Sequence, residues 1–390
     1  MKVLIVGAGG YGQVYVQELL RCSRADVMVE GVVDTRIDAC PMKDEIIAAN
    51  IPVYTTMEAF YAEHTADLAV ISTPTFLHCE QSVCALSHGS QVLCEKPAAS
   101  LVADAQQMLD AERMYDGFIG IGFQWAFHGG IRALKQDILD GKLGKPLSLK
   151  TFVSWPRTKT YYARGGGWGG RIRKDGYVIL DSILSNACAH YVQNMLFVLG
   201  DTMDESAALM QVEAECARVH DIENFDTCVL RGRTAQGVKV YFSATHAGQI
   251  NRDPEFIYIF ENAVVEYRSD RDPEIVVTFA DGTQTKYGDP TRDAERKLWD
   301  AVECVRAGTR PVCTVKTALP HTMLVNALYE HASIAEVPRD MVRDEGDRVY
   351  AVGLYEMLVD AYEHEAMLSE RGCAFVNKNT WTMGGNNNVL

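Results

Sequence analysis

The stretch VLIVGAGGYG, residues 3–12, decides the fold of the first part of this chain of 390 residues. Four apolar residues predict a buried strand, and Gly7, Gly9 and Gly12 follow in the spacing G-x-G-x-x-G. Gly7 would permit a tight turn, Gly9 would let the backbone approach a pyrophosphate, and Gly12 would let the next helix pack closely on the strand. The motif therefore predicts a turn that holds a dinucleotide at a helix N-terminus.

An acidic residue stands where such a turn needs one. Asp34 lies 22 residues after Gly12, where a carboxylate can accept hydrogen bonds from the adenosine ribose. Asp34 would repel the 2'-phosphate of NADP, whereas Arg36 could pair with it, so we expect NAD and keep NADP as the alternative. We expect Gly10 and Tyr11 to lie in the same binding turn. The competing interpretation is a glycine turn without a ligand and an aspartate that only caps the next helix.

Short apolar runs alternate with helix-like stretches over residues 1–122. Alternation of this kind indicates parallel βαβ units. The runs, apolar on both faces as buried parallel strands are, lie at 3–6, 27–33, 68–72, 91–94 and 118–121. We therefore predict an α/β protein whose residues 1–122 form a doubly wound parallel sheet of the Rossmann type.

The pattern changes after residue 122. A helix is expected near 131–139 and a strand at 147–153. Alternating apolar residues predict further strands at 211–218, 227–231, 238–244, 256–260, 264–267 and 275–279. Helices are expected at 293–306, 318–335 and 349–370, before a frayed tail, TMGGNNNVL. Residues 123–390 are thus predicted to form an α+β domain around a large, mainly antiparallel sheet.

Composition limits the partners. The net charge of −15 argues against nucleic acid and anionic membranes, because both need a dense excess of Lys and Arg. Eleven cysteines without a CxxC pair predict neither a disulfide framework nor a metal site. The N-terminus enters a strand-like run at once, and no apolar run reaches eighteen residues. We expect a cytoplasmic protein with a small-molecule ligand.

Two groups of polar residues are candidates for chemistry. Lys96 follows the strand at 91–94, at the carboxyl edge where open α/β sheets bind ligands; a surface lysine is the alternative. In an apolar stretch, Asn186, His190 and Asn194 recur every fourth residue, so on a helix they share one face. Histidine suits proton transfer near neutral pH, and the alternative is a core histidine held by its neighbours.

Four motifs together resemble a known family. GAGGYG, STPTFLH at 72–78, CEKP at 94–97 and the N-x-x-x-H of Asn186 and His190 are similar to the glucose-fructose oxidoreductase, inositol dehydrogenase and MocA family, written Gfo/Idh/MocA. The resemblance implies a Rossmann domain and a C-terminal domain whose open sheet face makes a homodimer or homotetramer. It places Thr73, Pro74 and His78 beside the dinucleotide, and Lys96 and His190 beside the substrate. We expect Glu95 and Lys96 to contact the cofactor as well.

The resemblance also implies hydride transfer to or from a sugar, an inositol or a related polyhydroxy compound. In such dehydrogenases the lysine of E-K-P and a D-x-x-x-H pair assist proton transfer, but here Asn186 replaces the acid. We expect His190 or Lys96 to move the hydroxyl proton while Asn186 and Asn194 orient the site. Redox-neutral elimination or glycoside cleavage with NAD is one alternative. A non-catalytic sensor is another, which the presence of both Lys96 and His190 opposes.

A basic segment indicates the kind of substrate. Residues 151–176 carry six basic residues against Asp175, whereas residues 1–122 carry 7 basic and 16 acidic ones. Aromatic faces stack on sugar rings, and guanidinium groups bind carboxylate or phosphate. The predicted substrate-binding residues here are Trp155, Arg157, Tyr162, Arg164 and Trp168. The alternative is a loop whose aromatic residues pack on the sheet and whose charges contact a neighbouring subunit.

Overall fold

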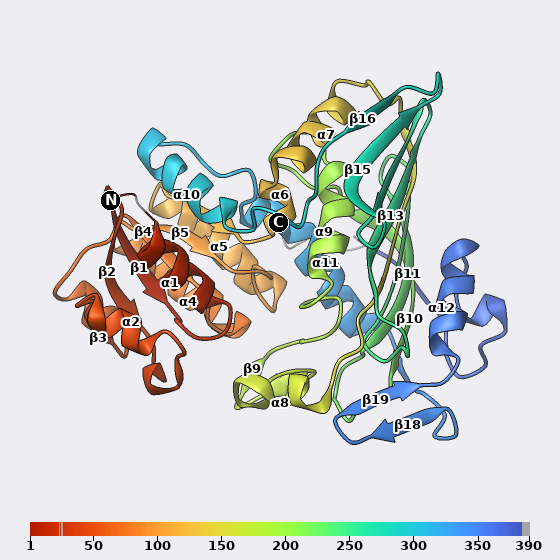
Figure 1. Cartoon of the computed structure of the whole chain (residues 1–390), viewed down its shortest axis with the longest axis horizontal. Helices are drawn as coiled ribbons and strands as arrows, with labels where there is room; N and C mark the ends of the chain where they lie inside the picture. The colour runs from red at the N-terminus through yellow and green to blue at the C-terminus, as the bar shows by residue number, and fades with distance from the viewer. Residues whose placement is uncertain (23, 25, 384–390) are drawn as a thin grey trace. The chain divides into compact units, whose positions relative to one another are not determined.

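The computed structural model describes residues 1–22, 24 and 26–383, and the chain folds into two compact units (Figure 1). The first comprises Met1–Phe127 and Asp293–Leu319, and the second comprises His128–Arg292 and Pro320–Leu390. The sequence places the whole of 123–390 in the second domain, whereas the structure returns Asp293–Leu319 to the first. The reason is a helix in that stretch whose apolar face completes the core under the first strand.

The described residues of the first unit form one six-stranded parallel sheet in the order β3-β2-β1-β4-β5-β6. The strands are β1 (Lys2–Val6), β2 (Met28–Val33), β3 (Val53–Tyr54), β4 (Leu68–Ile71), β5 (Gln91–Cys94) and β6 (Ile119–Ile121). Strand β4 is buried at every position, as its apolar sequence predicts. The predicted Rossmann-type sheet is confirmed, and its strand order reverses between β1 and β4, where such sheets bind ligands.

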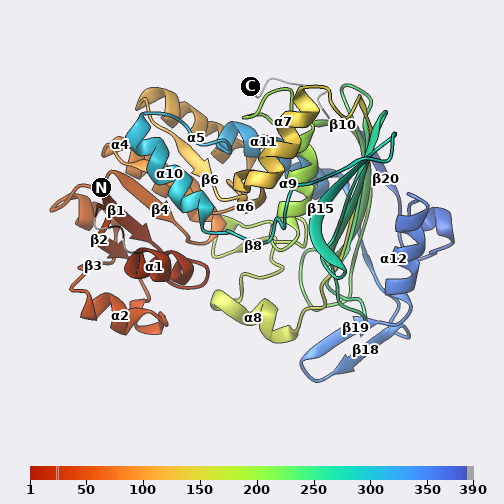
Figure 2. The same ribbon diagram turned by 45° about the horizontal axis from the view of Figure 1, so that its top comes forward.

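Helices cover both faces of this sheet. They are α1 (Gly12–Arg21), α2 (Lys43–Ala48), α3 (Met57–Tyr61), α4 (His78–Ser87), α5 (Val102–Met114), α6 (Gln124–Phe127) and α10 (Arg296–Ala307). Helices α1 and α10 share one core with β1, through Tyr15, Leu19, Leu298 and Val302, and lie beside each other in Figure 2. The crossovers through α4 and α5 run toward the opposite edge of the sheet, so these helices cover the other face.

The described residues of the second unit build a ten-stranded mixed sheet. Its order is β16-β15-β14-β13-β7-β12-β11-β10-β17, with β20 also paired to β10. Its strands are β7 (Pro146–Ser154), β10 (Leu209–Arg218), β11 (Thr227–Thr234), β12 (Lys239–Thr245), β13 (Arg252–Phe260), β14 (Ala263–Arg268), β15 (Asp272–Phe279), β16 (Gln284–Lys286), β17 (Ile334–Glu336) and β20 (Asn379–Thr382). Only β7 with β12 and β10 with β17 pair in parallel among these strands, so the predicted large, mainly antiparallel sheet is confirmed.

Among the remaining elements, two of the predicted helices have other bounds in the structure. The helices are α7 (Gly129–Leu139), α8 (Lys159–Gly167), α9 (Ala189–Val198), α11 (Val315–His331) and α12 (Leu354–Glu363), and two small hairpins pair β8 (Arg173–Lys174) with β9 (Tyr177–Val178) and β18 (Val342–Glu345) with β19 (Arg348–Ala351). The helix expected at 349–370 begins only at Leu354, because Gly346 and Gly353 adopt positive φ and punctuate the chain. The helix expected to reach residue 335 ends at His331, and strand β17 follows. Of the tail expected to fray, residues 384–390 lie outside the described residues.

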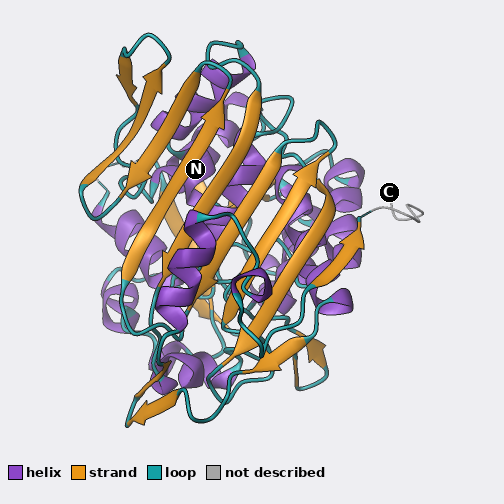
Figure 3. Cartoon of the chain, turned by 90° about the vertical axis from the view of Figure 1, so that its right-hand side faces the viewer, coloured by secondary structure: helices purple, strands orange, loops and turns teal. Residues whose placement is uncertain are grey.

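A C-terminal strap, residues 354–382, covers part of one face of the large sheet. Leu354, Leu358 and Tyr362 of α12 pack with Phe152 of β7 and Tyr241 of β12 in one apolar cluster. Helix α12, at the right edge of Figure 1, crosses the front of the sheet in Figure 3. None of the helices in the described parts of the chain combines the length and apolarity that crossing a bilayer requires.

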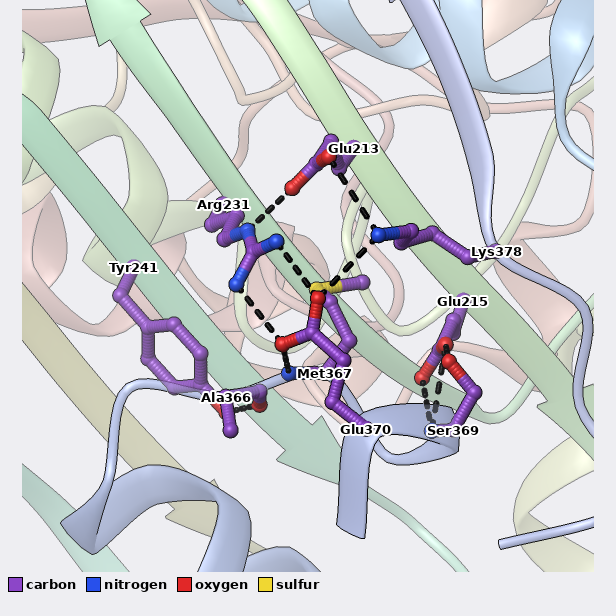
Figure 4. A network of polar contacts seen from close by, with 9 residues as sticks. All are labelled: Glu213, Glu215, Arg231, Tyr241, Ala366, Met367, Ser369, Glu370 and Lys378. Carbon is purple, nitrogen blue, oxygen red and sulfur yellow. Dashed lines mark hydrogen bonds and ion pairs between the residues drawn. The ribbon is translucent and has the colours of Figure 1, made fainter. Parts of the chain in front are cut away.

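Charged residues fasten the strap to the sheet (Figure 4). Arg231 of β11 contacts Glu213 of β10 and forms a fork with Glu370, at 2.9 and 2.7 Å to its two oxygens. Glu215, buried in β10, accepts the backbone N–H of Ser369 at 3.2 Å. Burial would raise the pKa of Glu370, but hydrogen bonds, first from Arg231, outweigh it and lower this pKa to about 2.

This shift predicts how stability depends on pH. The lowered pKa of Glu370 stabilises the folded chain above the ordinary glutamate pKa of about 4.3, and the contribution disappears as the pH falls toward about 2. We expect Glu370→Gln to be less stable than the wild type at pH 7, with a difference that narrows between pH 5 and pH 3. Urea denaturation across this range measures it. Glu274→Gln, at an exposed pair with Lys286, is the control, and a gap that stays constant with pH would contradict the assignment.

Candidate active site

The glycine turn joins β1 to α1 and fits a dinucleotide phosphate. Gly7 has a φ of +84°, so the tight turn requires glycine there. A Cβ on Gly12 would lie 1.9 Å from the carbonyl oxygen of Gly7, so the third position also requires glycine. A Cβ on Gly9 would meet no protein atom within 4 Å. The turn therefore leaves open space in front of Gly9, where close approach of a ligand to the backbone is expected.

Asp34 is bonded to this turn. Its Oδ2 accepts the backbone N–H of Ala8 at 2.9 Å, and its Oδ1 accepts that of Arg36 at 2.7 Å. The carboxylate is half-buried, whereas Arg36 is exposed. A carboxylate has about four acceptor positions, so lone pairs are left for the hydroxyls of an adenosine ribose. The residues present fit NAD.

The charge of Asp34 predicts cofactor preference. Asp34→Asn keeps an oxygen for Ala8 and removes the repulsion of a 2'-phosphate, while Arg36 stays available to pair with that phosphate. We expect the ratio of kcat/KM with NADP to kcat/KM with NAD to rise about tenfold, which corresponds to about 1.4 kcal/mol. Steady-state kinetics with each cofactor measures the ratio. Asp38→Asn, at an exposed pair with Lys43, is the control, and an unchanged ratio in Asp34→Asn would contradict the role of the carboxylate.

Two loops follow β4 and β5 at the same edge of the sheet, and His78 ties them together. Its Nε2 lies 3.0 Å from the carbonyl oxygen of Thr73, and its Nδ1 lies 2.9 Å from that of Pro97. Burial lowers its pKa. His78, predicted to line the dinucleotide, is thus buried behind the loops and holds them, whereas Thr73 and Pro74 are partly exposed.

Lys96 and Glu95 leave β5 in different directions. Lys96 is partly exposed at the carboxyl edge. Glu95 is buried, accepts the hydroxyl of Tyr15 at 2.5 Å and contacts the ammonium group of Lys297 on α10. Burial would raise the pKa of Glu95, but the charge and hydrogen bond of Lys297 outweigh it and lower this pKa. Sequence reasoning did not find Lys297, whose one signal is a lysine on the apolar face of a helix, beside Leu298.

The second unit holds the predicted polar stripe, but not on a single helix. Helix α9 begins at Ala189, so it carries His190 and Asn194, while Asn186 lies in the preceding turn. Ser182 and Ser185 cause the delay, because their hydroxyls bond to backbone groups of the turn. The expectation of one shared helical face is therefore wrong for Asn186. Asn194 is 2% exposed and donates its amide to the hydroxyl of Tyr258 at 2.9 Å.

A carboxylate that the sequence analysis missed stands behind Asn186. Asp181 is buried, accepts the amide of Asn186 at 2.9 Å and accepts the backbone N–H of Gly170 at 2.6 Å. An aspartate at position 186 would face Asp181 at this distance, and two carboxylates so close resist ionising together. The amide avoids that repulsion. The carboxylate that is absent at position 186 is thus present at position 181, five residues earlier in the chain.

The basic aromatic segment after β7 forms a stack of rings and guanidinium groups. Arg157 lies 5.2 Å from the ring of Trp155 and 4.8 Å from that of Tyr161. Arg164 lies 3.5 Å from the same Tyr161 and 5.0 Å from Trp168. No carboxylate pairs with either arginine within the described part of the chain. The predicted aromatic and basic residues therefore come together, with both guanidinium groups free of an internal anion.

Buried histidines anchor this segment to the sheet. His220 lies 2.7 Å from Oδ2 of Asp226 and 3.1 Å from the carbonyl oxygen of Arg157, and its ring packs on Tyr162 at 4.9 Å. Burial would lower the pKa of His220, but Asp226 raises it overall. Both ring nitrogens face acceptors, an arrangement that favours the protonated ring. His246 bonds to the carbonyl oxygen of Trp155 at 2.9 Å. These anchors lie in the bends next to β10, β11 and β12, far from the segment in the chain, and no signal in the sequence pointed to them.

The first unit resembles known proteins in sequence. A sequence profile described as the GFO_IDH_MocA oxidoreductase family with an NAD-binding Rossmann fold matches residues 1–123. Residues 1–123 are thus similar in sequence to this Gfo/Idh/MocA family. The resemblance stated from the motifs is confirmed, and NAD, named in the family description, is the cofactor that the glycine turn and Asp34 predict. Helix α10, with Lys297, lies outside the matched residues.

Individual relatives agree with the Gfo/Idh/MocA assignment. The chain is 29% identical to 1,5-anhydro-D-fructose reductase of Ensifer adhaerens over 158 residues, 40% of this chain and 44% of that protein. It is 34% identical to inositol 2-dehydrogenase of Renibacterium salmoninarum over 150 residues, 38% of this chain and 44% of that protein. The matched part thus spans less than half the length of these relatives.

The likeness of fold extends further than the likeness of sequence. The structure of the WlbA dehydrogenase from Bordetella pertussis, solved with NADH and UDP-GlcNAcA, superimposes with a TM-score of 0.68 at 21% identity. The superposition covers 85% of this chain and 95% of that one. The likeness of fold therefore extends into the second unit, beyond the residues that match in sequence.

Proposed function

We propose that this chain is an NAD-dependent oxidoreductase that transfers hydride between nicotinamide and a secondary alcohol or carbonyl of a polyhydroxy substrate. One observation carries the proposal. The turn after β1, Asp34 after β2, Thr73 after β4 and Lys96 after β5 all lie at the carboxyl ends of one parallel sheet, on both sides of the point where the strand order reverses. A dinucleotide held there has a titratable lysine at the same edge.

The residues of the chain have distinct proposed tasks. The bound nicotinamide would supply the hydride acceptor or donor. Lys96 Nζ or the His190 ring would take the proton of the reacting hydroxyl and return it in the reverse direction. Asn186, fixed by Asp181, is proposed to orient the reacting groups. Asn194 is proposed to act through Tyr258, because its amide is already donated to that hydroxyl.

The proposed substrate is a sugar, an inositol or a related compound, with an anionic group as a favoured feature. Supporting this are two arginines, Arg157 and Arg164, that have no carboxylate partner among the described residues, in a chain with 52 acidic and 37 basic residues. Trp155 and Trp168 flank them, and Tyr162 places a buried hydroxyl nearby. Guanidinium groups bind carboxylate or phosphate, and aromatic rings stack on sugars.

We also propose a cytoplasmic location and a homodimer or homotetramer assembled through the large sheet. The strap covers β7 and β12, so the proposed surface lies on the neighbouring strands of the same face. Ile257 and Ile259 of β13 and Val264 of β14 are half-buried there, as residues of a self-association surface often are. Sedimentation velocity measures the assembly, and a monomer at all concentrations would contradict it.

A substrate screen tests the proposed function. Sugars, inositols, uronates and sugar amines are offered with NAD and with NADP, while the absorbance of the reduced nicotinamide and the products are both followed. We expect reduced cofactor to accumulate with NAD, fastest with an acidic sugar. A product that forms without reduced cofactor would replace this proposal with a redox-neutral reaction. Tight NAD binding without any turnover would favour a sensor.

A further inference from the structure

A buried ion pair includes Glu95, the residue before the proposed catalytic lysine. The ammonium group of Lys297 is 1% exposed and contacts the carboxylate of Glu95, the residue before Lys96. It also lies 4.2 Å from the ring of Tyr11 and 3.5 Å from the carbonyl oxygen of Gly122. Tyr15 donates its hydroxyl to the same carboxylate oxygen at 2.5 Å. All of these residues belong to the first unit.

The cluster joins the two parts of the site that the sequence separates. Tyr11 and Tyr15 flank the start of α1, the helix that the glycine turn opens, and Glu95 begins the loop that carries Lys96. Lys297 comes from α10, 202 residues after Glu95. One ammonium group thus contacts both the helix at the phosphate-binding turn and the loop of Lys96.

Stability alone does not explain such a pair. Burying two charges costs several kcal/mol, and apolar residues of similar size often serve a core as well. The carboxylate of Glu95 is, however, also bonded to the backbone N–H of Lys96, at 3.2 Å, and it interacts electrostatically with the Lys96 side chain. A change in the charge of Glu95 is therefore felt at Lys96.

We propose that Lys297 is a positioning residue for Lys96: its ammonium group neutralises and fixes Glu95, so that Lys96 can release its proton. The inference rests on the proposed function only in giving Lys96 a proton to move. Without Lys297, the Glu95 carboxylate would interact more strongly with the Lys96 ammonium group and hold its proton. An opposite charge within about 4–6 Å shifts a pKa by about 1–3 units.

The sign of each change follows from the charges. The titratable groups that face Glu95 are Lys297, Tyr15, Tyr11, Lys96, His78 and Cys94. Removing the cation of Lys297 favours the charged form of Lys96 and raises its pKa. Removing the anion of Glu95 lowers the pKa of Lys96. When both charges are removed, the two shifts largely cancel and the pKa of Lys96 changes little. Loss of packing alone would not produce shifts of opposite sign.

The test follows Lys96 directly, in the whole chain without substrate. Lysines are reductively methylated with a carbon-13 label and titrated by NMR, and the Lys96 signal is assigned by its absence in Lys96→Arg. We expect Lys297→Met to raise the pKa of Lys96 by about one unit, Glu95→Gln to lower it, and Glu95→Gln/Lys297→Met to return it close to the wild type. Lys43→Met, which removes a cation from an exposed pair in the same unit, is the control.

The outcomes separate the inference from the proposed function. An unchanged or lowered Lys96 pKa in folded Lys297→Met would overturn the inference. If Lys297→Met does not fold, Glu95→Gln and the double variant decide, and equal shifts in both would overturn it too. Once a substrate is known, the acidic limb of the pH profile of kcat/KM for alcohol oxidation, where Lys96 becomes protonated, is expected to move in the same directions. If no substrate turns over, the proposed oxidoreductase fails while the NMR titration still stands.

Discussion

Replacing Lys96 by methionine is expected to lower turnover by about 10²- to 10⁴-fold while NAD still binds, because a positioned acid–base group contributes a factor of this size. Methionine keeps much of the length of the side chain and removes the proton. His190→Ala is expected to lower turnover by a smaller factor if Lys96 is the main base, and by a similar one if the two share the proton. Initial rates with the substrate from the screen, together with NAD titration by fluorescence, separate catalysis from binding.

The control for this prediction is Lys43→Met, which changes an exposed lysine of the same unit. Turnover of that variant is expected to match the wild type. If Lys96→Met and His190→Ala both turned over normally with NAD bound, neither residue would move the proton. The base would then have to be sought among other groups, of which the Asp181 carboxylate behind Asn186 is the first candidate.

Two alanine substitutions in the glycine turn are expected to weaken NAD binding for different reasons. Gly9→Ala adds a methyl group that meets no protein atom within 4 Å, so the melting temperature should stay unchanged, while NAD binding should weaken about tenfold or more as the backbone loses its close approach to the pyrophosphate. Gly12→Ala places its methyl group 1.9 Å from the Gly7 carbonyl oxygen. Such overpacking should cost about 1–3 kcal/mol of stability and remove NAD binding as well.

Calorimetry of NAD binding and thermal unfolding without cofactor distinguish the two variants. The pair serves as its own control, since both substitutions add one methyl group within four residues. Normal NAD affinity in Gly9→Ala would mean that the dinucleotide does not approach the turn at Gly9. Normal stability in Gly12→Ala would mean that α1 can shift away from β1.

Local patterns were read correctly from the sequence, and distant contacts were not. The glycine turn, Asp34 and the apolar runs of the parallel sheet depend on neighbours in the chain or on simple periodicity. The prediction that Asn186 shares a helical face with His190 was wrong, because the hydroxyls of Ser182 and Ser185 bond to the backbone before the helix begins. The spacing of every fourth residue does not take such bonds into account. Spacing along the chain does not reveal the partners of residues such as Lys297, His220 and Asp226.

Helix α10 has a consequence for exchanging parts between proteins. A fragment that ends at Phe127 would leave the apolar faces of α1 and β1 uncovered and the buried Glu95 without its counter-ion. In a hybrid whose first 127 residues come from a relative, Lys297 of this chain would have to pack against the strands of the other protein. A hybrid that receives the nucleotide-binding unit should therefore receive residues 293–319 together with residues 1–127. We expect such hybrids to express and to bind cofactor, and hybrids without residues 293–319 to do neither.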